Sequence, residues 1–94
     1  KGVTGARESI LEETKDTVVR ILKARGDKKN LAVCIGFGIS TPEHVSEIVN
    51  MGADGVIVGS AIIQKIEDNL TDPQKMIFEV QKFVKQMKGA TLAK

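Results

Sequence analysis

The sequence is poor in cysteine and in aromatic residues, and these shortages exclude several classes of protein. A single cysteine rules out a disulfide within the chain, which favours a reducing compartment, and we expect the cytoplasm. Tryptophan and tyrosine are missing and only three phenylalanines are present, so the stacking of nucleic-acid bases is not expected. A net charge of +2, spread over scattered basic residues, indicates no nucleic-acid or membrane surface. No apolar run approaches the ~20 residues of a membrane span, and no signal peptide is visible.

What is present fits one globular segment, residues 1–94. The hydrophobic share is 41% and the charged share 28%, which is typical of a folded domain rather than a disordered chain. The chain begins at Lys1, without Met, and runs at once into a glycine-rich loop, Gly2-Val3-Thr4-Gly5. We therefore expect it to be the later part of a longer protein whose N-terminal part has been removed.

The stretch around residues 34–43 organises the rest. An apolar run over residues 31–35 predicts a strand, and the Gly36-Phe37-Gly38 sequence that follows predicts a tight turn. Ser40-x-x-Glu43 has the spacing of a capping box, with Pro42 in the first turn of the helix that follows. Because a helix N-terminus exposes N–H groups and partial positive charge, this turn is a candidate phosphate site.

The remaining patterns predict alternating helices and strands. A second apolar strand over residues 55–58 ends in Gly59-Ser60. Helices are expected over residues 9–25, 41–51, 61–66 and from Asp72 to about Gly89. This alternation indicates an α/β fold with two buried parallel strands, covered on both faces. Two such strands leave two open sheet edges, so we expect them to be neighbours in a larger barrel or sheet.

Both predicted strands end in glycine, and the carboxyl ends of adjacent parallel strands lie side by side. In (β/α)8 barrels a phosphate commonly sits between the last two strand-end loops, at the start of a short extra helix. The candidate donors are the N–H groups of Gly38, Ile39, Gly59 and Ser60, with the Ser60 hydroxyl. The alternative is that these glycines only permit tight turns.

Three segments resemble one family. Residues 2–7 (GVTGAR), residues 36–43 (GFGISTPE) and residues 53–62 (ADGVIVGSAI) are similar to the tryptophan synthase alpha subunit. The resemblance implies the C-terminal portion of a (β/α)8 TIM barrel: helix 6, strand 7, helix 7, strand 8, short helix 8′ and helix 8. Val58 departs from the common pattern, since many relatives carry a small polar residue there.

The resemblance also implies a function. The family cleaves indole-3-glycerol phosphate to indole and glyceraldehyde 3-phosphate in tryptophan biosynthesis, by acid–base chemistry of carboxylates and with no cofactor or metal. Its catalytic Glu and Asp lie in the N-terminal half of the barrel, so this segment holds no catalytic residue and is expected to be inactive alone. The implied phosphate ligands are Gly5, Gly38, Ile39, Gly59 and Ser60. Phe37 and Ile57 would line the indole pocket.

Two further implications concern residues and partners outside the two turns. Thr4 would belong to a mobile loop that orients an upstream catalytic Asp. The full-length protein would pair with a beta subunit as a heterotetramer, mostly through loops that this segment lacks. The role of Arg7 stays open between guarding the phosphate and lying in solvent.

Other conspicuous residues have simpler interpretations. Cys34 lies within an apolar strand and is expected to be a buried structural thiol. His44, in the first turn of its helix, is expected to lie in solvent. Glu43 is explained by the capping box. A stripe on the last helix predicts core packing: Met76, Val80, Phe83, Val84 and Met87.

Two other functions stay open on the sequence. The chain could be the phosphate-binding portion of another sugar-phosphate or prenyl-phosphate barrel, which would share the glycine turns but would not require Thr4 or Phe37. It could also be a non-catalytic fragment that acts as a folding or assembly module through its open strand edges.

Overall fold

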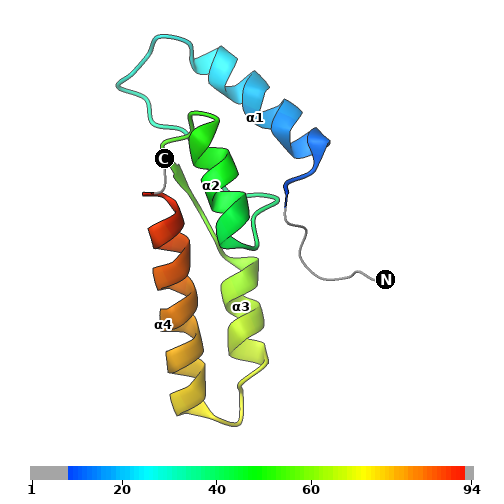
Figure 1. Ribbon diagram of the computed structural model, residues 1–94, viewed down its shortest axis with the longest axis vertical. Helices are drawn as coiled ribbons and strands as arrows, with labels where there is room; N and C mark the ends of the chain where they lie inside the picture. The colour runs from blue at the N-terminus through cyan, green and yellow to red at the C-terminus, as the bar shows by residue number, and fades with distance from the viewer. Residues whose placement is uncertain (1–8, 93–94) are drawn as a thin grey trace.

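The computed structural model describes residues 9–92, which form four helices and one pair of short strands (Figure 1). The helices are α1 (Glu12–Arg25), α2 (Pro42–Asn50), α3 (Ser60–Glu67) and α4 (Pro73–Ala90). The strands are β1 (Cys34–Ile35) and β2 (Gly55–Val56). The predicted order of elements is therefore confirmed, although each strand is shorter than the apolar run that predicted it.

The two strands run parallel, as the connection through a helix predicted. Cys34 is paired with Gly55 and Ile35 with Val56. The Asp54 N–H donates to the Val33 carbonyl at 2.8 Å, and the Ile57 N–H to the Ile35 carbonyl at 2.8 Å, just beyond the two ends of the pair. β1 and β2 are thus joined at both ends by backbone hydrogen bonds, and their carboxyl ends lie together.

Helix α2 lies at the centre and contributes to two hydrophobic clusters. One face, through Ile48, packs against Val33 and Ile35 of the β1 segment and Val18 of α1. The other, through Val45 and Val49, packs against Phe83 and Met87 of α4. Val18, Val45 and Ile48 have no exposed surface, so these apolar positions lie on the inward faces of α1 and α2. Val19 of α1, also part of the apolar pattern, is 45% exposed.

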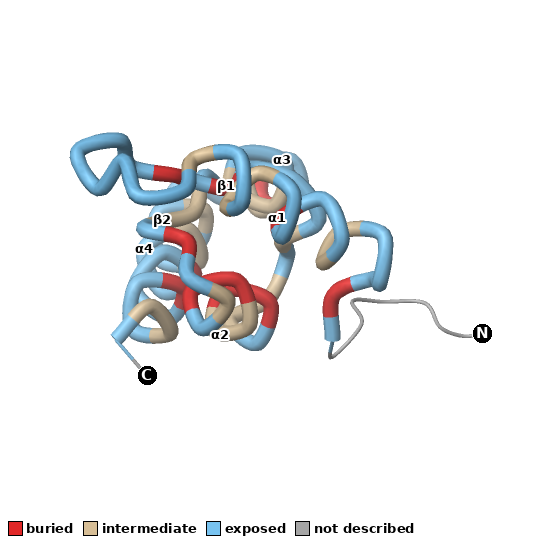
Figure 2. Tube along the Cα trace, turned by 90° about the horizontal axis from the view of Figure 1, so that it is seen from above, coloured by how far each residue is buried: buried red, intermediate tan, exposed pale blue. Residues whose placement is uncertain are grey.

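The strands are not covered on both faces within residues 9–92. Val33 and Ile35 are buried, whereas Cys34 between them is exposed, because helices α1 and α2 cover only one side of the pair (Figure 2). The prediction of a buried Cys34 thiol is therefore wrong for this structure. Successive side chains of a strand point to opposite faces, and the described residues provide partners for one face only.

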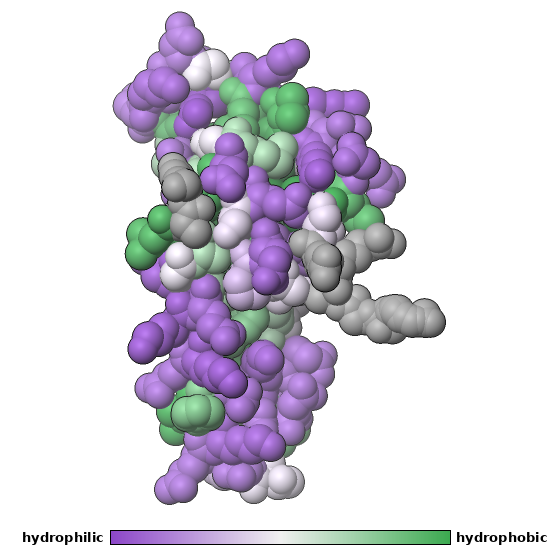
Figure 3. All heavy atoms as spheres, in the orientation of Figure 1, coloured by the Kyte–Doolittle hydropathy of each residue, from purple (hydrophilic) through white to green (hydrophobic). Residues whose placement is uncertain are grey.

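The last helix is also less buried than its sequence pattern predicted. Phe83 and Met87 are buried, Met76 and Val80 are partly buried, and Val84 is 45% exposed. Val84 was therefore assigned to the core wrongly: α4 packs mainly against α2 and α3 and leaves this part of its surface uncovered among the described residues. On the face seen in Figure 3, apolar residues form separate patches among hydrophilic side chains.

Candidate functional site

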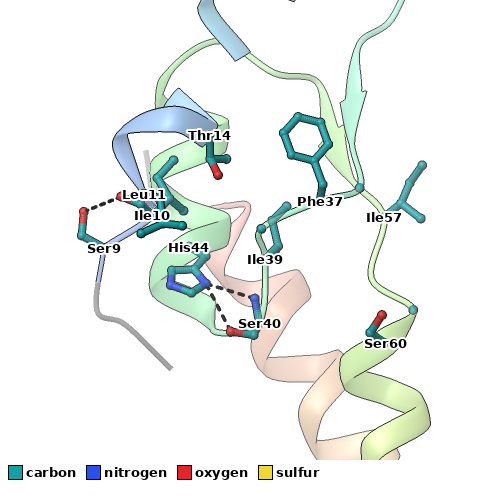
Figure 4. A pocket seen from close by; sticks show the side chains of 13 residues that line it. Ser9, Ile10, Leu11, Thr14, Phe37, Ile39, Ser40, His44, Ile57 and Ser60 are labelled. Carbon is teal, nitrogen blue, oxygen red and sulfur yellow. Dashed lines mark hydrogen bonds between the residues drawn. The ribbon is translucent and has the colours of Figure 1, made fainter. Parts of the chain in front are cut away.

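A cavity of about 610 Å³ lies at the carboxyl ends of the two strands, between the start of α1 and the two strand-end turns (Figure 4). It is lined by residues from three parts of the chain: Ser9, Ile10, Leu11, Thr14, Gly36, Phe37, Gly38, Ile39, Ser40, His44, Ile57, Gly59 and Ser60. None of these lining residues carries a carboxylate, a lysine or an arginine. The described wall therefore offers hydroxyl groups, backbone groups, one imidazole and apolar surface.

The turn after β1 requires glycine for steric reasons. Gly38 has φ +72°, a conformation that strains any residue with a Cβ atom. A Cβ at Gly38 would lie 3.0 Å from Oγ1 of Thr14, so α1 closes over this turn. At Gly36 a Cβ would lie 3.3 Å from Cβ of Ile57, which brings the ends of the two strands into contact.

The turn after β2 opens α3, and here a glycine has open space beside it. Gly59 is the N-cap of α3 and Ser60 its first residue. Apart from its two chain neighbours, no described residue has a heavy atom within 4 Å of the position that a Cβ at Gly59 would take, so packing does not demand glycine. Within residues 9–92, the N–H groups of Gly38, Ile39, Gly59 and Ser60 have no hydrogen-bond acceptor. The two turns thus present unused donors at one cavity.

Two apolar side chains flank these turns. Phe37 is 42% exposed and Ile57 is 63% exposed, although both line the cavity. Figure 4 shows them projecting from the ends of the neighbouring strands. Large apolar side chains that remain exposed at the mouth of a cavity are typical of a surface that a ligand covers.

The start of α2 differs from the prediction in two respects. Thr41, not Ser40, is the N-cap, and its Oγ1 accepts a hydrogen bond from the His44 N–H at 3.2 Å. Ser40 lies one residue before the cap, so the Ser40–Glu43 capping box is wrong. His44 is only 5% exposed rather than solvated, and its Nδ1 accepts a hydrogen bond from the Ser40 N–H at 3.0 Å.

The opposite wall, at the start of α1, is held by Glu47 of α2. Oε1 of Glu47 accepts from the Ile10 N–H at 2.8 Å, and Oε2 accepts from the Ser9 hydroxyl at 3.0 Å. Nζ of Lys15 lies 3.6 Å from the same Oε2. Burial raises the pKa of Glu47, but these hydrogen bonds and the lysine charge outweigh it and hold the pKa below its ordinary value. Glu47 therefore stays ionised and ties the two helices together beside the cavity.

The structure brings six of the predicted site residues to this one cavity. They are the four residues of the two turns, Gly38, Ile39, Gly59 and Ser60, and the two apolar residues, Phe37 and Ile57. Thr4, Gly5 and Arg7 lie outside the described residues. The sequence interpretation missed Thr14 and His44. For His44 a signal existed, because a residue three positions after an N-cap can reach back to the turn before the helix.

Features of other functional classes are not seen in the described part of the chain. Within residues 9–92 no three His, Cys, Asp or Glu side chains are grouped so that they could hold a metal ion. No helix in the same range combines the length and apolar character needed to cross a membrane.

Sequence comparison gives the family. Residues 1–92 match the family described as tryptophan synthase alpha chain. Tryptophan synthase alpha chains of Methanoregula boonei and Methanothermobacter thermautotrophicus are each 45% identical over 95% of this chain, and that of Arabidopsis thaliana is 41% identical over 98%. The chain spans about a third of the length of these relatives, 32% in each case. On this match over nearly its whole length, the chain belongs to the tryptophan synthase alpha chain family, whose fold is a TIM barrel.

Proposed function

We propose that this chain supplies the phosphate-binding turns and part of the indole pocket of a lyase that cleaves indole-3-glycerol phosphate to indole and glyceraldehyde 3-phosphate. Its elements would be helix 6 to helix 8 of the barrel, with α3 as the short extra helix before α4. One observation carries the proposal. Both strand-end turns, with N–H groups that lack an acceptor among the described residues, line the same cavity, and Phe37 and Ile57 line it beside them.

The phosphate would be held without a formal positive charge from the described wall. Backbone N–H groups of Gly38, Ile39, Gly59 and Ser60 would donate to its oxygens, together with the Ser60 hydroxyl and, from the loop before α1, Gly5. The N-terminus of α3 adds about half a positive charge in the same direction. The open space beside Gly59 would let a phosphate oxygen approach the backbone closely.

The indole would lie against Phe37 and Ile57, where covering their exposed surface favours a flat apolar ring. General acid–base catalysis would come from carboxylates outside this chain, with Thr4 orienting one of them. We therefore expect the chain by itself to bind phosphate without catalysis. The whole protein would work with a beta subunit that takes up the indole.

A titration of the 15N-labelled chain with inorganic phosphate, followed by amide chemical shifts, tests the phosphate site. The largest shift changes are expected at Gly38, Ile39, Gly59 and Ser60. Shift changes confined to other residues, or none at millimolar phosphate, would contradict the proposal.

The indole pocket is tested in a chimera that places this chain after the part of the Methanothermobacter protein that it does not match. The chimera is expected to release indole from indole-3-glycerol phosphate. Phe37→Leu should raise its KM severalfold while leaving phosphate affinity nearly unchanged. Phe78→Leu, on α4 and outside the cavity lining, is the matched control. A folded chimera that releases no indole, or equal effects of the two substitutions, would contradict the assignment.

A further inference from the structure

We infer that His44 is a positioning residue for the anion-binding turn: its imidazole Nδ1 fixes the backbone of residues 36–40 so that the N–H groups of Gly38 and Ile39 face the cavity. The inference rests on the proposed phosphate site and adds to it a residue that touches the turn rather than the ligand.

The contact is well defined by geometry. The Ser40 N–H donates to His44 Nδ1 at 3.0 Å, and the Ser40 hydroxyl lies 3.4 Å from the same nitrogen (Figure 4). A backbone N–H can only donate, so Nδ1 is the acceptor and the neutral ring carries its proton on Nε2.

The backbone of His44 is held in the first turn of α2. The residue is 5% exposed, and its backbone N–H donates to the Thr41 side chain, which caps α2. The next residue, Val45, is fully buried against α4. The ring therefore extends from a capped and packed helix back to the turn that precedes it.

The turn needs such a support because glycine leaves its backbone free to move and part of it lacks hydrogen bonds. Gly38 has φ +72°, and the N–H groups of Gly38 and Ile39 have no acceptor within residues 9–92. A glycine-containing turn without internal hydrogen bonds has several accessible conformations. The Ser40–His44 bond fixes its last residue and reduces that freedom, which is the preorganisation that binding of an anion requires.

Two substitutions distinguish the hydrogen-bond acceptor of the His44 side chain from the space that its ring fills. In His44→Asn the side-chain Oδ1 can take the place of Nδ1 and accept from Ser40, whereas His44→Leu fills a similar volume and accepts nothing. Each variant is measured for amide exchange of Ser40, for phosphate affinity with inorganic phosphate, and for its thermal midpoint. The thermal midpoint separates a general loss of fold from a local effect on the turn.

We expect His44→Leu to speed exchange of the Ser40 amide and to weaken phosphate binding about threefold to tenfold, since one hydrogen bond contributes on that scale. His44→Asn should restore both. Equal phosphate affinity in the two variants, or unchanged Ser40 exchange in His44→Leu, would overturn the inference. If the wild-type chain binds no phosphate but the two variants still differ at Ser40, the proposed function fails while the hold of His44 on the turn stands.

Discussion

The two ends of the parallel strand pair use their polar groups in opposite ways. At the amino end, Oδ2 of Asp54 accepts from the Val33 N–H at 2.8 Å and from Nη1 of Arg25 at 2.9 Å. Nη1 of Arg25 also reaches the Leu31 carbonyl at 3.4 Å. At the carboxyl end, the N–H groups of Gly38, Ile39, Gly59 and Ser60 have no acceptor in the described structure.

This difference separates a stabilising end from a binding end. Polar groups that satisfy one another hold the strands together but have little left for a ligand. Groups left unsatisfied cost stability unless water or a ligand pairs with them. The same division is general in barrels, where the carboxyl end carries the site and the amino end carries stability. Three changes test whether the two ends are as separate as they look.

The largest effect is expected from Ile48→Ala, which should weaken the packing at both ends of the strand pair and so reduce the difference between them. Ile48 is fully buried in the cluster that includes Ile10 beside the cavity and Val33 at the amino end. Loss of its side chain leaves a void that costs about 2–5 kcal/mol of unfolding free energy. Denaturant unfolding measures it, with the 55% exposed Ile63→Ala as control. Equal losses for the two would show that the cluster is loosely packed.

A smaller effect is expected from Gly38→Ala, which should act on the carboxyl end of the strand pair and leave the amino end unchanged. A positive φ costs a residue with a Cβ about 1–2 kcal/mol, and the Cβ would press on the Thr14 side chain. The matched control is Gly26→Ala at the end of α1, where φ is +59° but no ligand is proposed. Both should lower stability, and Gly38→Ala alone should lower phosphate affinity in a titration. Loss of affinity in both would point to general unfolding.

The smallest effect is expected from Asp54→Asn at the amino end. The Val33 hydrogen bond, opposed by burial and helped by the Arg25 charge, holds the pKa of Asp54 below its ordinary value of 3.8. The carboxylate therefore contributes stability that is present above that value and is lost as the pH falls through the lowered one. Asparagine keeps an acceptor for Val33 but loses the charge.

The variant should consequently be slightly less stable at neutral pH, and its stability should fall less steeply in acid. Thermal midpoints between pH 2 and 7 measure both. Phosphate affinity should stay at the wild-type level, because Asp54 does not line the cavity. A change in affinity would mean that the two ends of the strand pair are coupled.

Much of the fold was predictable, because it follows local rules. α1 ends at Arg25, where its end was expected, and α4 begins at Pro73, where Asp72 caps it by accepting from the Lys75 N–H at 3.1 Å. Val18 and Ile48 lie buried on two of the helices that were expected, over residues 9–25 and 41–51. Burial was predicted less well, since it depends on what packs against each face. Cys34 and Val84 belong to apolar sequence patterns, but no described residues cover their side chains.

The candidate cavity was predictable in its turns but not in its walls. Glycine at two neighbouring strand ends is a signal that the sequence carries by itself, so Gly38 and Gly59 could be expected to lie together. Thr14, Ser9 and Glu47 reach the cavity region only through packing of α1 on α2, which is a long-range contact with no local pattern. His44 stands between these cases, because its reach to Ser40 is local but depends on which residue caps the helix.

The exposed Cys34 gives the uncovered face of the strand pair a chemical reporter. It is the sole thiol in the sequence, and its neighbour across the pair is Gly55. A Cβ added at Gly55 would lie 3.2 Å from the Cys34 sulfur. Because Cys34 is exposed, a thiol reagent can reach its sulfur. Its labelling rate, followed by mass spectrometry, would fall when another part of a barrel covers that face.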